Sequence, residues 1–133
     1  TKKIQIEARV FGDLAMNHII PVATHYQTML LKNVQNMRNV FPADKADKLS
    51  ERNPKIIEEI AERTQIIETG VEELVNARKV ANKIEDEHAK AIAYHDTVAP
   101  KMDVIRYNID KLELIVEDDL WTLPKYREML FIR

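Results

Sequence analysis

The stretch EARVFGDLAMNHIIPVATHYQ, residues 7–27, decides the fold class of this chain. With its neighbours it sets a series of mainly apolar residues three or four positions apart, on one face of a helix: Ile4, Ala8, Phe11, Ala15, His18, Val22, His25 and Met29. The spacing keeps its phase across Pro21, which removes a backbone donor and crowds the preceding turn. We therefore expect one kinked helix, which Pro42 ends. Its apolar face is carried onward by Tyr26, Leu30, Val34, Met37 and Phe41.

Two further stripes of the same kind follow. The first begins after Asn53, a good N-cap residue, with Pro54 in the first helical position. It comprises Ile57, Ile60, Thr64, Ile67, Val71, Leu74, Arg78 and Ala81. The second crosses Pro100 without losing its phase, so another kink is expected there. It comprises Ile84, His88, Ala91, His95, Val98, Met102, Ile105, Ile109, Leu112 and Val116.

The segments between the stripes are short and polar. Residues 42–53, PADKADKLSERN, are expected to form an exposed connector that can include a short helical turn. Between Ala81 and Ile84 the stripe steps by three where four is expected, which predicts a tight turn near Asn82, with one continuous helix as the alternative. Residues 120–133, LWTLPKYREMLFIR, form a C-terminal tail in which Pro124 can open a short helix.

Composition points to the same fold class. The chain has 133 residues, enough for a single domain with a real core, and it is 32% charged and 45% hydrophobic with only two glycines. Long helices with solvated outer faces and no sheet fit these values. We predict an all-α fold of residues 1–133, an elongated antiparallel bundle of three long helices with proline kinks and a short C-terminal helix.

Charge and residue usage argue against several classes of protein. The net charge is −2 and the basic residues are spread out, so nucleic acid is not an expected partner. The chain has no cysteine and no apolar run of the length of a membrane span, so we expect a cytoplasmic protein without a membrane partner. Gly12 and Gly70 lie far apart and cannot form a phosphate-binding loop.

The histidines are the first candidates for chemistry. They form two pairs, each seven residues apart: His18 with His25, and His88 with His95. The members of a pair stand about 10 Å apart along a helix, so they cannot share one metal ion. Glu85 and His88 match the Glu-x-x-His spacing of di-metal helical bundles, but a second such motif is missing. We favour partly buried histidines with satisfied hydrogen bonds over a metal site.

The remaining candidates are a serine and a possible interface. Ser50 lies in a polar connector without a nearby histidine, so a hydrolase triad has almost no support. Aromatic and acidic residues near the C-terminus can close the bundle end or contact a partner, since aromatic side chains dominate interface hot spots. These candidate interface residues are Trp121, Leu123, Tyr126, Phe131, Glu117, Asp118 and Asp119.

Three stretches cover most of the chain: EARVFGDLAMNHIIPVATHYQ, KIEDEHAKAIAYHDTVAPKMDVIRYNIDKLELIVEDDLW and LPKYREMLFIR. They resemble the C-terminal region of bacterial type III glutamine synthetase. The resemblance covers nearly the whole chain and is weakest in the connector and the second helix. It implies a parent enzyme that forms glutamine from glutamate, ammonia and ATP with Mg or Mn, in a large oligomer of stacked rings.

The resemblance also implies that the catalytic part lies upstream of these residues. No family metal ligand or nucleotide contact carries over, because no position matches such a motif. We expect a non-catalytic accessory or assembly domain whose partners are the upstream catalytic domain and neighbouring subunits. A free-standing helical interaction module and, with less support, a metal-binding helical bundle are the alternatives.

Overall fold

The computed structural model describes residues 2–116 of the chain, and every element in them is helical. The elements in order are α1 (Lys2–Leu14), the π-helical turn η1 (Ala15–Ile19), α2 (Ile20–Val40), α3 (Ala43–Leu49), α4 (Arg52–Asn82), α5 (Glu87–Ala93), the π-helical turn η2 (Tyr94–Val98) and α6 (Ala99–Ile115). The all-α prediction is confirmed over this part of the chain.

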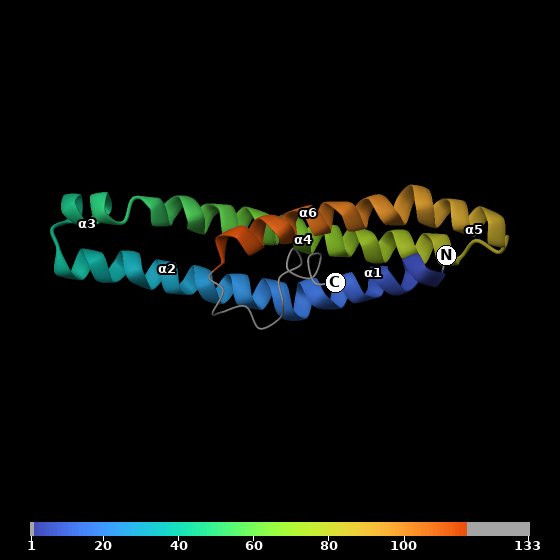
Figure 1. Ribbon diagram of the computed structural model, residues 1–133, viewed down its shortest axis with the longest axis horizontal. Coiled ribbons are helices and arrows are strands. Elements are labelled where there is room, and N and C mark those ends of the chain that lie inside the picture. The colour runs from blue at the N-terminus through green and yellow to red at the C-terminus, as the bar shows by residue number, and fades with distance from the viewer. Residues whose placement is uncertain (1, 117–133) are drawn as a thin grey trace, which may run out of the picture.

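The molecule is long and narrow. Figure 1 shows α1, η1 and α2 as one extended helical pass, after which the chain turns at α3 and returns along it as α4. After a second turn, α5, η2 and α6 run back beside α4 and α1. The end of α6 stops short of α3. The chain beyond it consists of α3 and the adjoining parts of α2 and α4, and we call this projecting segment the arm.

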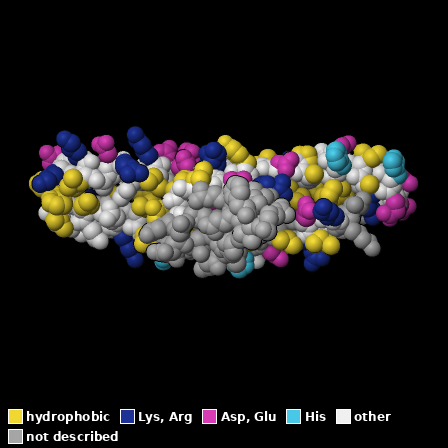
Figure 2. All heavy atoms as spheres, viewed as in Figure 1, with side chains coloured by type: hydrophobic (Ala, Val, Ile, Leu, Met, Phe, Trp, Pro, Cys, Tyr) yellow, Lys and Arg dark blue, Asp and Glu magenta, His cyan; other side chains and the backbone are white. Residues whose placement is uncertain are grey.

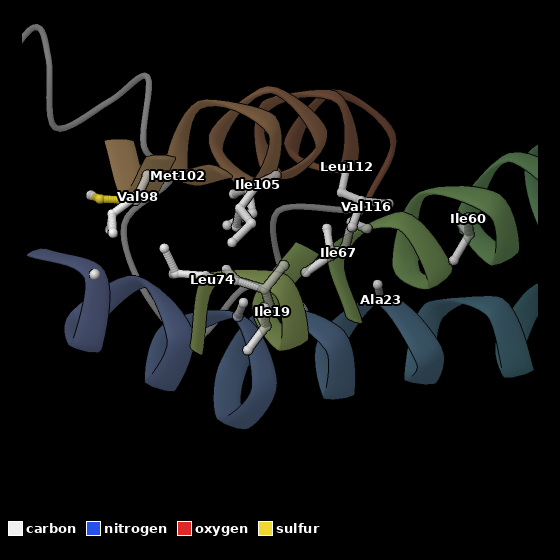
Figure 3. Close-up of a cluster of buried hydrophobic side chains, with 14 of the residues drawn as sticks. Ile19, Ala23, Ile60, Ile67, Leu74, Val98, Met102, Ile105, Leu112 and Val116 are labelled. Atoms are coloured by element: carbon white, nitrogen blue, oxygen red, sulfur yellow. The ribbon is translucent and has the colours of Figure 1, made fainter. Parts of the chain in front are cut away.

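The core forms where the three passes meet (Figure 3). Buried positions of α4 match the predicted stripe at Ile60, Ile67, Val71, Leu74 and Ala81. The buried apolar residues of the last pass match it from Val98 onward: Val98, Met102, Ile105, Ile109, Leu112 and Val116. Burial of such apolar side chains provides the main driving force for folding.

The predicted face of the first helix is wrong at its two histidines. His18 and His25 are exposed, and Ile19 and Ala23 are buried instead. Val22, Tyr26 and Leu30 pack against the core, as predicted. At Ile19 and Ala23 the buried position lies one residue later than the stripe predicts.

The shift originates in η1. The N–H of Ile20 donates to the carbonyl of Ala15, five residues back rather than four. A π-helical turn contains one extra residue, so every later residue is displaced by one position around the helix. Pro21 follows directly, and because proline lacks an N–H and crowds the carbonyl four residues earlier, a wider turn before it relieves that contact.

The last pass also has a π-helical turn directly before a proline. In η2 the N–H of Ala99 donates to the carbonyl of Tyr94, and Pro100 comes next. Tyr94 is buried where the prediction places His95, which is exposed. The chain remains helical across both prolines, as the uninterrupted phase of the stripes predicts. The phase alone does not reveal that a π turn accompanies each proline.

The connector at 42–53 contains the short helix α3, which the prediction allows. Ser50 after it is buried rather than exposed, and its Oγ donates to the carbonyl of Ala46 at 2.7 Å. The N-cap prediction for Asn53 is wrong, because α4 begins at Arg52. The Asn53 side-chain Nδ2 instead donates to Oδ1 of Asn33 on α2, at 2.9 Å. This hydrogen bond links the N-terminal end of α4 to α2.

The turn predicted near Asn82 is confirmed, since α4 ends there and α5 starts at Glu87. Asp86 caps α5 by accepting a hydrogen bond from the N–H of Ala89 at 2.9 Å. The Oδ1 of Asn82 accepts from the Tyr94 hydroxyl and, at 3.2 Å, from Nε2 of Gln5. These hydrogen bonds link the C-terminal end of α4 to α1 and to η2.

The two glycines should respond oppositely to substitution. A Cβ at Gly70 would lie 3.0 Å from Cγ1 of the buried Ile105, whereas at Gly12 the nearest atom, Cγ1 of Val71, is 3.9 Å away. We expect Gly70→Val to lower the free energy of unfolding by about 1–3 kcal/mol through overpacking. Gly12→Ala should raise it by about 0.5–1 kcal/mol, because alanine is the better helix former. Urea unfolding of both variants tests the pair, and equal effects of the same sign would contradict it.

Candidate functional site

The structure does not assemble the histidines into a site. All four are exposed, so the prediction of partly buried histidines is wrong. The π turns explain the exposure of His18, His25 and His95. Glu85 lies in the turn before α5, so Glu85 and His88 do not share one helix. Within residues 2–116 there is no group of three or more acidic or histidine side chains that could hold a metal ion.

The predicted interface at the C-terminus cannot be compared with the structure. Trp121, Leu123, Tyr126 and Phe131 lie outside the described residues, as do Glu117, Asp118 and Asp119. Their role in a contact stays a prediction. Within the described part, no helix is both long and apolar enough to pass through a lipid bilayer.

The outer face of α4 and α6 carries a cluster of interacting polar side chains that the sequence analysis missed. The cluster consists of Arg63, Tyr107, Asn108 and Lys111, and we call it the Tyr107 cluster. Arg63 lies over the Tyr107 ring with Cζ 5.6 Å from the centroid, and Lys111 with Nζ 5.3 Å from it. An exposed aromatic ring that contacts two cations has the residue types found at recognition surfaces.

The arginine of the cluster is held in place by a buried amide. Arg63 Nη1 donates to Oδ1 of Asn108 at 3.0 Å, and Nδ2 of Asn108 donates to the carbonyl of Val104 at 2.9 Å. Asn108 is only 5% exposed, so its side chain is fixed by the packing of α4 against α6. Arg63 therefore has less rotamer freedom to lose if the surface binds a partner.

Exposed apolar side chains surround this cluster. Ile66 on α4 and Val104 and Leu114 on α6 are exposed, and Tyr107 itself is half exposed. A shallow groove runs between α4 and α6 beside Ile66 and Val104, with Gly70 in its wall. A sequence signal for this surface exists: Val104, Tyr107 and Leu114 fall outside the core stripe of α6 but repeat three and seven residues apart.

The arm carries a second apolar groove, between α2 and α4. It is lined by Leu31, Val34, Gln35, Arg38, Pro54, Ile57, Glu58 and Ala61. Figure 2 shows hydrophobic side chains gathered at this end of the molecule, where α2 meets α3. An ion pair between Arg38 and Asp47, 2.7 Å apart, links α2 to α3 near the groove. The molecule thus presents exposed apolar side chains on the arm as well as on the outer face of α4 and α6.

One carboxylate, Asp110 on α6, has a perturbed pKa. Burial of the group raises its pKa above the ordinary value, and the nearby Arg106 guanidinium lowers it by a smaller amount. Its Oδ1 atom is buried and has no hydrogen-bond partner among the described residues. Folding therefore shifts the titration of this carboxyl to a higher pKa than in the unfolded chain.

Asp110 should make the domain less stable as the carboxyl ionises. The pKa of Asp110 is about 4 in the unfolded chain and higher in the folded chain. Between these two pKa values the folded state binds more protons than the unfolded state. The free energy of unfolding therefore falls as pH rises through that range. Asp110→Asn should remove this fall and raise the free energy of unfolding slightly at neutral pH. Urea unfolding at several pH values from about 4 to 7 tests this. A variant with the same pH profile as the parent chain would contradict it.

Comparison with known proteins gives relatives of one kind. A sequence profile described as the glutamine synthetase C-terminal domain matches residues 1–38. Over its full 133 residues the chain is 45% identical to a glutamine synthetase of Bacteroides fragilis (strain YCH46). Over 132 residues, 99% of the chain, it is 28% identical to a type-3 glutamine synthetase of Dictyostelium discoideum. The chain spans 18% of the length of each of these relatives. It is thus similar to one part of glutamine synthetases, and its first 38 residues match the C-terminal domain of that family.

Proposed function

We propose that this segment is a non-catalytic assembly domain of a glutamine synthetase. The parent enzyme would join ammonia to glutamate with ATP and Mg or Mn, using residues outside this chain, and would reside in the cytoplasm. The partners of the segment are the catalytic body of the same polypeptide and neighbouring subunits of a homo-oligomer. We propose that it acts as an elongated antiparallel bundle of three long helices with proline kinks, completed by a short C-terminal helix.

The observation that carries this proposal is the amount of apolar surface left on the long helices. Large apolar side chains are exposed on both the arm and the outer face of α4 and α6, for example Leu31, Val104 and Leu114 at 51%, 47% and 61%. Single exposed apolar residues are ordinary, but rows of them along helices mark protein contact surfaces. The apolar and aromatic residues of the segment 120–133 would add to such a contact.

The experiment compares the parent synthetase with and without this segment. Analytical ultracentrifugation measures the oligomer, and glutamine formation is assayed on the same samples. Dissociation of the oligomer on deletion would support an assembly domain that bridges subunits. An intact oligomer with altered kinetics would support packing against the catalytic body. Normal assembly with normal turnover would refute the proposal.

A further inference from the structure

We infer that the outer face of α4 and α6, centred on the Tyr107 cluster, docks onto a carboxylate-bearing surface of the parent synthetase outside this chain. This inference rests on the proposed function, because it names the face through which the segment would contact the rest of the enzyme. The arm groove is the competing face. The argument for the Tyr107 cluster comes from its charge, its rigidity and its apolar surroundings.

Among residues 2–116, no ion pair balances the charge of the cluster. Of the cations on α6, Lys101 pairs with Glu73 at 3.0 Å and Arg106 with Asp103 at 3.2 Å. Lys111 and Arg63 have no carboxylate within ion-pair distance among residues 2–116; both lie against the Tyr107 ring instead. A guanidinium keeps several N–H donors, and Arg63 uses one of them on Asn108. The remaining donors and the Lys111 ammonium can receive carboxylates from a partner.

The arrangement matches the anatomy of an interface hot spot. Tyrosine and arginine are enriched at such sites, and a rigid side chain loses little entropy on binding. Arg63 is held by the buried Asn108, and the Tyr107 ring contacts both cations. The exposed Ile66, Val104 and Leu114 can exclude water around this centre. In the arm groove the cation Arg38 is already neutralised by Asp47, so it offers no equivalent charge.

A second copy of the same face does not fit as the occupant. In a two-fold symmetric contact the same patch meets itself, which would bring the Arg63 and Lys111 side chains of both copies together. Like charges opposed at an interface are unfavourable. The occupant must instead bring carboxylates, and we place it in the part of the parent enzyme that lies outside residues 1–133.

The test is site-specific photocrosslinking in the purified full-length parent enzyme. Tyr107→benzoylphenylalanine places a photoreactive group on the proposed face, and Leu31→benzoylphenylalanine places one on the arm groove as the matched control. We expect position 107 to crosslink to a peptide rich in Asp and Glu from outside residues 1–133. Crosslinks from position 107 only to residues 1–133, or none at all, would overturn the inference.

The control position separates failure of this inference from failure of the proposed function. Crosslinks to the catalytic part from position 31 but not from 107 would mean that the segment docks by the arm, so the inference fails and the proposed function stands. If neither position crosslinks and deletion of the segment leaves assembly and turnover normal, both fail.

A charge reversal provides an independent readout. We expect Lys111→Glu to lower the crosslinking yield from position 107 at least about fivefold at low salt, because a carboxylate then faces the carboxylates of the partner. Lys32→Glu, an exposed reversal on α2, should leave the yield within about twofold. Equal losses from the two reversals would show a general effect of net charge and would contradict a carboxylate partner at this face.

Discussion

Deletion of Glu68 from α4 is expected to unfold the domain, whereas deletion of Met16 from η1 is expected to leave it folded. Both residues are exposed, so neither deletion removes a buried side chain. α4 is regular α-helix over 31 residues, and losing one residue rotates everything beyond it by about 100°. Its buried residues on one side of the deletion would then point to solvent, a loss of more than about 5 kcal/mol.

Met16 differs because η1 already contains one residue more than an α-helical turn. Its removal converts the π turn into an α turn and keeps Ala15 and Ile19 on the face they occupy now. Pro21 would then clash with the preceding turn of a regular α-helix. Both deletions should therefore be made in the Pro21→Ala variant. In that background we expect the Met16 deletion to cost less than about 2 kcal/mol.

Circular dichroism with thermal and urea unfolding measures both deletions, and Pro21→Ala alone is the reference. Comparable losses of stability from the two deletions would mean that the π turn does not set the phase of the first pass. The same logic applies to η2 and Pro100, which repeat the arrangement in the last pass.

Ile105→Ala is expected to lower the free energy of unfolding by about 2–5 kcal/mol. Ile105 is completely buried where α6 crosses α4, and it packs against the position of Gly70. Truncation removes apolar contact and leaves a cavity that the surrounding helices fill only in part. Urea unfolding measures the loss.

The neighbouring Val104 provides the matched control for this truncation. It is 47% exposed on the outer face, so Val104→Ala should change the free energy of unfolding by less than about 0.5 kcal/mol. Similar losses for Val104→Ala and Ile105→Ala would place the core on a different face of α6 from the one described.

The stripes of α4 and of residues 98–116 were predictable because no extra residue interrupts them. In a regular α-helix the spacing of apolar residues fixes the buried face directly, as it does for Ile60, Ile67 and Leu74. In the first pass the same rule fails at His18 and His25, since the π turn at Ala15–Ile19 places Ile19 and Ala23 in the core. Pro21 and Pro100 mark the two places, but a proline also permits a simple kink.

The Tyr107 cluster could not be predicted because its partners come from different helices. Tyr107, Asn108 and Lys111 are close in sequence, yet Arg63 is 45 residues away from Asn108 and reaches it only when α4 packs on α6. Asn108 also falls outside the predicted core stripe, and its burial follows from the same contact. A sequence pattern reports periodicity within a helix and carries no information about which helix lies opposite.

By itself the sequence determined that this protein is all-helical, that its second turn lies near Asn82, and that it resembles the C-terminal region of a glutamine synthetase. These features depend on local spacing, on breaks in that spacing and on similarity along the chain. Only the tertiary structure decided that His18 and His25 face solvent and that Arg63 meets Tyr107 and Asn108. The physical reason is that hydrogen-bond register in a helix and contacts between helices are selected by packing, after the helical tendency of each segment is already fixed.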